Sequence, residues 1–152
     1  IVEGVLGSVA SVVEKSGANL SSDIGPRPMT VLGNVTALNG AISNLVTNAI
    51  EAGAKNVKIE LVADTKNVMI SVKNDGPMIK PEVSDHIFEP FYTTKSNGTG
   101  LGLAVVAAVA KVHQGDIRLV SNEKETVFTM IIPKYEGVLE PSESFKDEKS
   151  VA

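Results

Sequence analysis

The chain has 152 residues, 43% of them hydrophobic and 21% charged, and 14 basic against 18 acidic side chains leave a net charge of −4. This composition provides the core of about one domain, excludes global disorder and, having no basic excess, disfavours nucleic acid as the main ligand. The absence of cysteine excludes disulfides, thiolate metal sites and cysteine nucleophiles, and no apolar run reaches the about 20 residues that span a bilayer, so we expect no membrane contact by this chain.

The first third of the chain is predicted to contain two helices. Apolar residues at helical spacing predict a helix over 2–15, and the Gly- and Pro-rich segment that follows predicts turns and short extended pieces, with a short strand over 29–32. A longer helix is predicted over 35–52, because Asn34 is a suitable N-cap and Gly53 a suitable C′ residue.

A hairpin and a long loop are predicted next. Residues 57–61 and 68–73 alternate between apolar and polar side chains, which is typical of strands with one buried face, and 64–67 supply the turn. Residues 74–98 show no sustained period and hold three prolines. A loop of this length in a compact domain is usually a lid or a binding loop.

The last part of the chain is predicted to be a helix over 100–113, ending at Gly115, and a second hairpin of strands 116–121 and 126–132. The acidic, Ser-rich residues 136–152 are predicted to be a disordered tail. This order of elements predicts an α+β fold, a two-layer α/β sandwich with a mixed, mostly antiparallel sheet and helices on one of its faces.

A polar stripe on the long helix is the first candidate for chemistry. At 100° per residue, Asn44, Asn48 and Glu51 fall in one narrow sector beside the apolar face. An amide oxygen there is a hard ligand suited to Mg²⁺, which shares its ligands with waters and substrate phosphates. The alternative is an ordinary solvated polar face.

Alternating glycines form the second candidate. Gly98, Gly100 and Gly102 lead directly into an apolar helix, where exposed backbone N–H groups and the helix N-terminus would cradle phosphate. Glycine inside a helix costs about 1 kcal/mol against alanine, so close approach of a ligand or of backbone would explain Gly102. The run is neither a Walker A motif nor a dinucleotide fingerprint, and the alternative is a flexible hinge.

Two loop segments complete the candidate site. In the run 88–95, Phe88 and Phe91 would anchor the loop to the core, and Lys95 would meet a terminal phosphate. Asn74 stands at a strand end, where a polar side chain can hydrogen-bond an adenine edge while Gly76 lets the base approach. Each segment alone could be an ordinary loop or turn.

The order and spacing of these segments resemble a known family. Residues Asn44–Ala49, Asn74–Pro77, Phe88–Lys95 and Gly98–Leu103 are similar to the N, G1, F and G2 boxes of sensor histidine kinases, over about Thr30–Pro133. The resemblance implies the GHKL (Bergerat) ATP-binding fold that gyrase, Hsp90 and MutL share. The Phe-Tyr-Thr-Thr-Lys run is most similar to NtrB-like kinases, including flagellar regulators of the FlrB and FleS kind.

The resemblance implies a protein-histidine kinase with three segments in this chain. Residues 1–28 would be a linker helix and the start of the ATP-binding domain, 29–135 the catalytic core and 136–152 the tail. The domain would donate the γ-phosphoryl of ATP to a histidine on its own upstream dimerisation domain. The resemblance also implies relay of the phosphoryl group to an NtrC-type response regulator, a sigma-54-dependent activator. It further implies that the full-length protein is a homodimer and that this domain is cytoplasmic.

The resemblance also assigns roles to residues. Asn48 would be the Mg²⁺ ligand, and Asn44, Asn48 and Lys95 the catalytic residues. The residues assigned to nucleotide binding are Asn48, Glu51, Ala52, Asn74, Asp75, Gly76, Met78, Ile79, Phe91, Thr93, Thr94, Lys95, Gly98, Thr99, Gly100, Leu101, Gly102 and Leu103.

The sequence departs from the family pattern at the G1 box. The family has Asp-x-Gly-x-Gly there, and its Asp accepts a hydrogen bond from the adenine amino group; this chain has Asn74 and Met78 instead. Asn74 can accept through its amide oxygen without charge assistance, so we expect nucleotide binding to be weaker by about 1–2 kcal/mol. Asp75 could rotate in, although its side chain starts on the other side of the strand.

A second contrast favours phosphoryl transfer over ATP hydrolysis. ATP-hydrolysing relatives carry a glutamate one turn before the metal-binding Asn as a base for water, whereas this chain has Asn44, which cannot take a proton. Neither His86 nor His113 is in the family's phosphoacceptor setting, and we interpret both as structural or solvent-facing. Because the chain begins at Ile1 rather than Met, we expect it to be a fragment whose acceptor histidine lies upstream.

Three alternatives stay open. An ATP-gated clamp or chaperone of the same fold is disfavoured by Asn44 and the short lid. A serine kinase of the anti-sigma type shares the boxes but lacks support from the Phe-Tyr-Thr-Thr-Lys run. A non-catalytic nucleotide sensor or scaffold would explain Asn74 and Met78 as loss of the nucleotide site.

Overall fold

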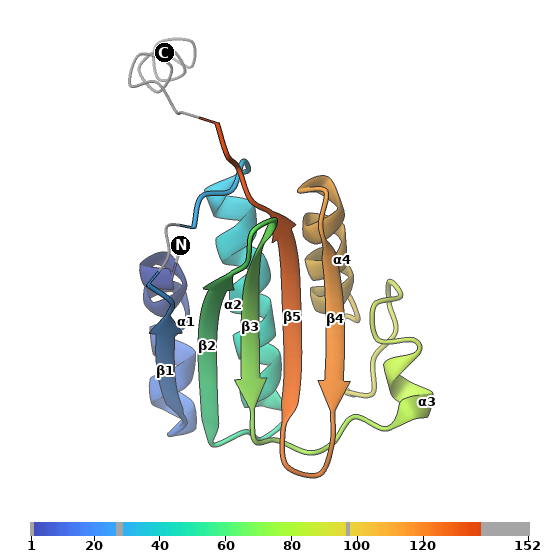
Figure 1. Cartoon of the computed structure of the whole chain (residues 1–152). Helices are drawn as coiled ribbons and strands as arrows, with labels where there is room; N and C mark the ends of the chain where they lie inside the picture. Colours follow the sequence, from blue (N-terminus) through green and yellow to red (C-terminus); the bar gives the residue numbers. More distant parts are fainter. Residues whose placement is uncertain (1, 27–28, 97, 138–152) are drawn as a thin grey trace, which may run out of the picture.

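The computed structural model describes residues 2–26, 29–96 and 98–137 as a five-stranded sheet with helices packed on one face (Figure 1). The strand order is β1-β2-β3-β5-β4, with β1 parallel to β2 and every other pair antiparallel. The predicted α+β sandwich is therefore confirmed. The elements are α1 (Val2–Ser16), β1 (Asn19–Ile24), α2 (Val35–Glu51), β2 (Asn56–Ala63), β3 (Asn67–Asn74), α3 (Pro81–Ser84), α4 (Gly102–Val112), β4 (Asp116–Ser121) and β5 (Thr126–Pro133).

The helix-facing side of the sheet forms half of the core. Strands β2, β3 and β5 alternate between buried and half-buried side chains, as the sequence predicts. The register places Ile59 beside Val72 and Val72 beside Phe128, all three buried. A one-residue slip would turn each of these rows to solvent, so burial fixes the register and, with it, the position of Asn74 at the end of β3.

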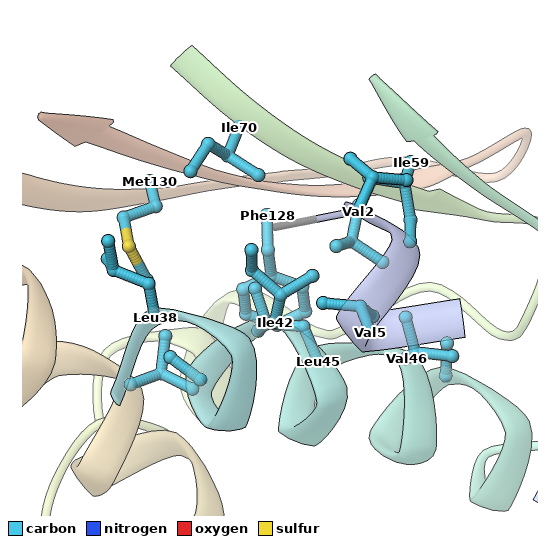
Figure 2. Close-up of a cluster of buried hydrophobic side chains, with 14 of the residues drawn as sticks. Val2, Val5, Leu38, Ile42, Leu45, Val46, Ile59, Ile70, Phe128 and Met130 are labelled. Atoms are coloured by element: carbon cyan, nitrogen blue, oxygen red, sulfur yellow. The ribbon is translucent and has the colours of Figure 1, made fainter. Parts of the chain in front are cut away.

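Helix α2 supplies the other half of the core. Asn34 caps the helix by accepting from the Ala37 N–H at 2.9 Å, and Gly53 follows it at φ 95°, as predicted. Its buried stripe faces the sheet, where Leu38 and Ile42 lie below Ile70, Met130 and Phe128 (Figure 2). Because α2 is held along its whole apolar face, its polar stripe has a fixed position.

Helix α1 packs against α2 and belongs to the same core. Val2, Val5 and Val9, spaced at helical intervals, are all buried. The Ser8 and Ser43 hydroxyls lie 2.6 Å apart across the two helices. Residues 19–24, predicted only as extended pieces, form an edge strand beside β2.

Three local predictions differ from the structure. The strand expected over 29–32 is a single bridge between Val31 and Lys134, because the chain turns at Gly33, where a Cβ would overlap the His113 ring. The loop 74–98 contains the four-residue helix α3, too short to give a periodic signal. The second helix begins at Gly102 because Gly100, at φ 71°, has no helical backbone conformation.

Most of the predicted disordered tail, residues 138–152, lies outside the described residues. Within the residues that are described, no helix is long and apolar enough to cross a bilayer.

The open face of the sheet carries a charge cluster that gives a pH prediction. Glu60 binds Lys73 at 2.8 Å and Lys58 at 2.9 Å, and the Lys73 hydrogen bond, followed by that of Lys58, lowers the pKa of Glu60 below its ordinary 4.5. Such a lowered pKa stabilises the fold above about pH 4.5, and the contribution is lost as pH falls through the folded pKa. Glu60→Gln should cost about 0.5–1 kcal/mol at pH 7 and leave stability less dependent on pH between about 5 and 3.

Urea unfolding of the parent chain and Glu60→Gln, at pH 7 and between about pH 5 and 3, measures this difference in stability. Added salt should make the difference smaller, because the three side chains are partly exposed. Equal acid sensitivity of Glu60→Gln and the parent chain would contradict the assignment.

Candidate active site

A cavity of about 340 Å³ lies beside the polar stripe of α2. It is bounded by the second half of α2, the segment from α3 to the glycines, and the start of α4, so it brings the N, F and G2 segments together. The lining residues are Asn44, Thr47, Asn48, Glu51, Val83, Ile87, Tyr92, Thr93, Thr94, Lys95, Gly98, Thr99, Gly100, Gly102 and Leu103. A larger cavity of about 700 Å³ at the other end of α2 and α4 is mainly apolar, and the convergent polar groups are in the smaller one.

The polar stripe of α2 contacts the ammonium group of Lys95. The Lys95 ammonium donates to Asn48 Oδ1 at 3.1 Å and lies 2.6 Å from Glu51 Oε2. One turn earlier, Asn44 Nδ2 donates to the Gly102 carbonyl at 3.4 Å and ties α2 to the start of α4. The predicted stripe is therefore assembled, and its outer end is an oxygen pair that receives positive charge.

This oxygen pair also fits a hard divalent cation. Within the described residues, no group of three His, Asp or Glu side chains could hold a metal. Mg²⁺ usually takes only one or two protein oxygens and completes its shell with waters and phosphate oxygens. Asn48 Oδ1, already facing an ammonium and lining the cavity, meets that requirement.

Glycine is present at positions 98, 100 and 102 for different physical reasons. Gly100, at φ 71°, lies against the Phe91 backbone, and an added Cβ would be 2.6 Å from the Phe91 Cα. At Gly98 an added Cβ would be 2.6 Å from the Thr93 hydroxyl. At Gly102 an added Cβ would meet nothing within 4 Å. Contacts within the protein thus account for Gly98 and Gly100, whereas Gly102 opens onto the cavity.

The start of α4 is free to bind an anion. The N-cap residue, Leu101, makes no side-chain capping hydrogen bond. The first N–H groups of a helix have no partner within the helix and carry partial positive charge. With Gly102 and Leu103 lining the cavity, these N–H groups can bind phosphate oxygens.

The two phenylalanines of the F segment have different positions. Phe88 packs edge-on against Phe128, with ring centroids 6.2 Å apart, and anchors the segment as predicted. The anchoring role expected for Phe91 is wrong. Its φ of 67° turns the side chain outward, where it is 74% exposed and does not line the cavity. Tyr92 lines the cavity instead, with its ring 5.6 Å from the His86 ring.

The strand-end segment separates two neighbouring polar side chains. Asn74 is 8% exposed and lies on the helix-facing side of β3, with its Oδ1 accepting from the Gly76 N–H at 3.0 Å. Asp75 points to the other side, where its Oδ1 accepts from the backbone N–H groups of Lys55 and Asn56 at 2.8 and 2.9 Å. These hydrogen bonds, that of the Asn56 N–H first, lower the pKa of Asp75. Asp75 is therefore a cap for the start of β2 and is not brought into the cavity.

Other predicted residues do not line the cavity. Met78 is 43% exposed, and Ile79 donates its N–H to Ser121 Oγ at 2.9 Å. The residues from the predicted set that are absent from the lining are Ala52, Asn74, Asp75, Gly76, Met78, Ile79, Phe91 and Leu101.

Several site residues were not predicted from the sequence. Thr47 follows the polar stripe on α2, and Val83 and Ile87 belong to the segment around α3 that periodicity did not detect. Outside the lining, Thr126 is 2% exposed and is the cross-strand partner of Asn74. Its hydroxyl lies 2.6 Å from that of Ser121. Pairing between β3 and β5 spans half the domain, so no local signal identifies Thr126.

His113 has a structural role and His86 faces solvent, in agreement with the prediction that both are structural or solvent-facing. His113 is buried: its Nδ1–H donates to the Val109 carbonyl at 2.7 Å and its Nε2 accepts from the Asn34 N–H at 3.0 Å. This neutral tautomer joins the end of α4 to the start of α2. His86 lies 3.1 Å from Glu89 on the surface. Neither lines the cavity.

The sequence of the chain is similar to those of known proteins, and this similarity identifies its family. Residues 33–136 match the family described as "Histidine kinase-, DNA gyrase B-, and HSP90-like ATPase". The chain is 35% identical over 120 residues to the sensor histidine kinase CpxA of Escherichia coli (strain K12), covering 75% of this chain and 26% of that protein. It is 38% identical over 109 residues to the heme sensor protein HssS of Staphylococcus aureus (strain Newman), covering 67% and 23%.

Solved structures agree in fold. The catalytic domain of histidine kinase ThkA is 32% identical with a TM-score of 0.77, covering 87% of this chain and 90% of that one. The mycobacterial sensor histidine kinase MprB is 25% identical with a TM-score of 0.75, covering 88% and 93%. The chain spans about a quarter of the length of the two curated relatives. It belongs to the histidine kinase-, DNA gyrase B- and HSP90-like ATPase family, as an ATP-binding catalytic domain of the sensor histidine kinase type.

Proposed function

We propose that this domain binds Mg·ATP in the cavity beside α2 and donates the γ-phosphoryl group to a histidine on a separate domain of the same protein. The observation that carries the proposal is the Asn48–Glu51 oxygen pair holding the Lys95 ammonium, next to the open position at Gly102. A cation-binding pair and an anion-binding helix terminus at one cavity match the two charges of a metal–phosphate complex.

Each residue would contribute positioning or charge. Asn48 would hold the metal through Oδ1, and the N–H groups from Gly102 onward would hold the phosphates. Lys95 would leave Glu51 for a phosphate oxygen once nucleotide is bound. The magnesium ion, when bound, neutralises phosphate charge and polarises the transferring group.

Asn44 supports transfer rather than hydrolysis. Its amide cannot accept a proton at neutral pH, and it is already engaged with the Gly102 carbonyl at 3.4 Å. No base for water is therefore supplied at the position where the hydrolysing relatives carry one. The γ-phosphoryl group would persist until a better nucleophile docks.

We further propose that the acceptor and the partners belong to other parts of the signalling system. Because neither His86 nor His113 is in the family's phosphoacceptor setting, the phosphoacceptor would be on an upstream dimerisation domain of a homodimeric protein, with the active site facing the cytoplasm. The proposed division is 1–28 as linker helix and start of the domain, 29–135 as catalytic core and 136–152 as tail. From the Phe-Tyr-Thr-Thr-Lys run we propose an NtrC-type response regulator, a sigma-54-dependent activator.

Calorimetric titration with ADP tests the nucleotide site directly. In the presence of Mg²⁺, ADP should bind saturably with one site per chain, and EDTA should lower the affinity by about tenfold or more, because only Lys95 and the α4 N–H groups then face the phosphate charge. ADP avoids turnover, so the heat reports binding only. An affinity that is the same with Mg²⁺ and with EDTA would contradict the metal site at Asn48.

A further inference from the structure

An apolar cavity of about 700 Å³ lies at the end of α2 and α4 opposite the proposed nucleotide site. Its lining includes Leu32, which precedes α2, and Val105 and Val112 of α4, which are 67%, 46% and 80% exposed. Val112 is the most exposed large apolar side chain among the described residues. Single exposed apolar residues are common on protein surfaces, but several that share one cavity indicate a surface that binds a partner.

The chain itself leads to this apolar cavity. Lys134 and Tyr135, which follow β5, line it, and β5 ends at the same end of the molecule as the N-terminus of α2 and the C-terminus of α4 (Figure 1). The Tyr135 N–H donates to the Thr30 carbonyl at 2.7 Å. Gly137, the last described residue, lies against the Tyr135 hydroxyl, which an added Cβ at position 137 would overlap. The segment that follows therefore begins at the rim of the cavity.

The sequence of that segment is complementary to the lining. Val138 and Leu139 come first and are apolar, and Glu140 follows them. Lys134 lines the cavity and forms no ion pair with another described residue, so an acidic side chain would find a partner there. Three extended residues span about 10 Å. The stretch of α4 from Val105 to Val112 also rises by about 10 Å, so the segment is long enough to cover it.

We propose that residues 138–140 of this chain dock in the apolar cavity, with Val138 and Leu139 against its apolar lining and Glu140 beside Lys134. The inference does not depend on the proposed nucleotide site. Because the segment is joined directly to the rim, docking is an intramolecular step with an effective concentration of about 1 mM or more, so weak apolar contacts suffice to populate it. Burial of the exposed valines of α4 under the docked segment stabilises the fold.

Replacing Leu139 by aspartate tests the contribution to stability. Leu139→Asp should lower the midpoint of thermal unfolding by about 3 °C, because the apolar contact is lost and a carboxylate would be unpaired in the cavity. Val151→Asp makes a similar change beyond the docked residues and should leave the midpoint within about 1 °C of that of the parent chain. Circular dichroism during heating measures both. Equal midpoints for Leu139→Asp and the parent chain would overturn the proposal.

A spin label tests the location of the segment. The chain has no cysteine, so Ser142→Cys provides a single attachment point for a nitroxide. In nuclear magnetic resonance spectra, the label should broaden the amide signals of Ala108 and Val112 far more than that of Gly76, which follows β3 at the opposite end of the sheet. Adding Leu139→Asp should reduce the broadening at Val112 by about half or more, because the docked population falls. Broadening of the same size in both variants would mean that the segment is only tethered near the cavity, and would overturn the proposal.

A mixed sample distinguishes the chain's own segment from that of a second copy. Spin-labelled Ser142→Cys chain without isotope is added to isotope-labelled parent chain without a spin label. The amide signals of Ala108 and Val112 should then keep their intensity, because each cavity is occupied by its own segment. Specific broadening of these signals would show that the segment docks in another molecule, and would overturn docking within one chain.

Discussion

Replacing Asn48 by alanine is expected to lower the affinity for Mg·ADP by about 100-fold, which corresponds to about 2.8 kcal/mol. Asn48 Oδ1 and a carboxylate oxygen of Glu51 form the oxygen pair that holds the Lys95 ammonium. The substitution removes the amide oxygen and leaves only the Glu51 carboxylate. The fold should persist, because the apolar face of α2 is untouched and the Lys95–Glu51 ion pair, 2.6 Å long in the parent chain, does not involve Asn48. Calorimetry with Mg·ADP measures the loss.

Asn39→Ala is the matched control for this substitution. Asn39 lies nine positions earlier on α2, about 13 Å along the axis and half a turn around it, where it packs against Gly4 of α1. Its Oδ1 is buried without a hydrogen-bond partner among the described residues. Asn39→Ala should therefore keep Mg·ADP affinity within about twofold. Equal losses in both variants would mean that α2 is perturbed as a whole and that Asn48 has no special role.

Much of the fold could be predicted because its signals are local. The alternation in β2, β3 and β5 and the apolar stripe of α2 each follow from burial on one face. The two ends of α2 follow from a side-chain cap at Asn34 and a left-handed residue at Gly53. These features need no knowledge of what the element packs against.

The missed features depend on contacts between distant segments. Residues 19–24 become a strand because the Asn19 N–H donates to the Lys55 carbonyl and the segment pairs in parallel with β2. Residues 29–32 fail to form one because Gly33 turns against the His113 ring, 80 positions later in the chain. Neither contact leaves a periodic trace in the sequence.

The same distinction applies to the site. Asn44, Asn48, Glu51 and Lys95 come together as expected, because helical spacing places the first three on one stripe and the segment 88–95 brings Lys95 to it. Phe91 could not be placed, because its left-handed backbone conformation follows from the close approach of Gly100.

Gly102→Ala is expected to change stability and binding in opposite directions. A Cβ at this position meets no atom within 4 Å, so the fold gains from the reduced freedom of the unfolded chain, by about 0.5 kcal/mol because Gly102 is the first residue of α4. The added methyl group would occupy space in front of the α4 N–H groups, where we place the phosphates. Mg·ADP affinity should fall by about tenfold or more.

Gly40→Ala separates these two effects. Gly40 is also helical and also meets nothing within 4 Å, but it lies on the exposed side of α2 and away from the cavity. It should gain about 0.5–1 kcal/mol in urea unfolding and bind Mg·ADP as the parent chain does. If Gly102→Ala also bound Mg·ADP with the affinity of the parent chain, binding would not require glycine at this position and the phosphates would lie elsewhere. If both variants are more stable and only Gly102→Ala binds Mg·ADP more weakly, the phosphates lie at the start of α4. No protein atom lies within 4 Å of the added Cβ at Gly102, so the weaker binding would come from contact with the ligand.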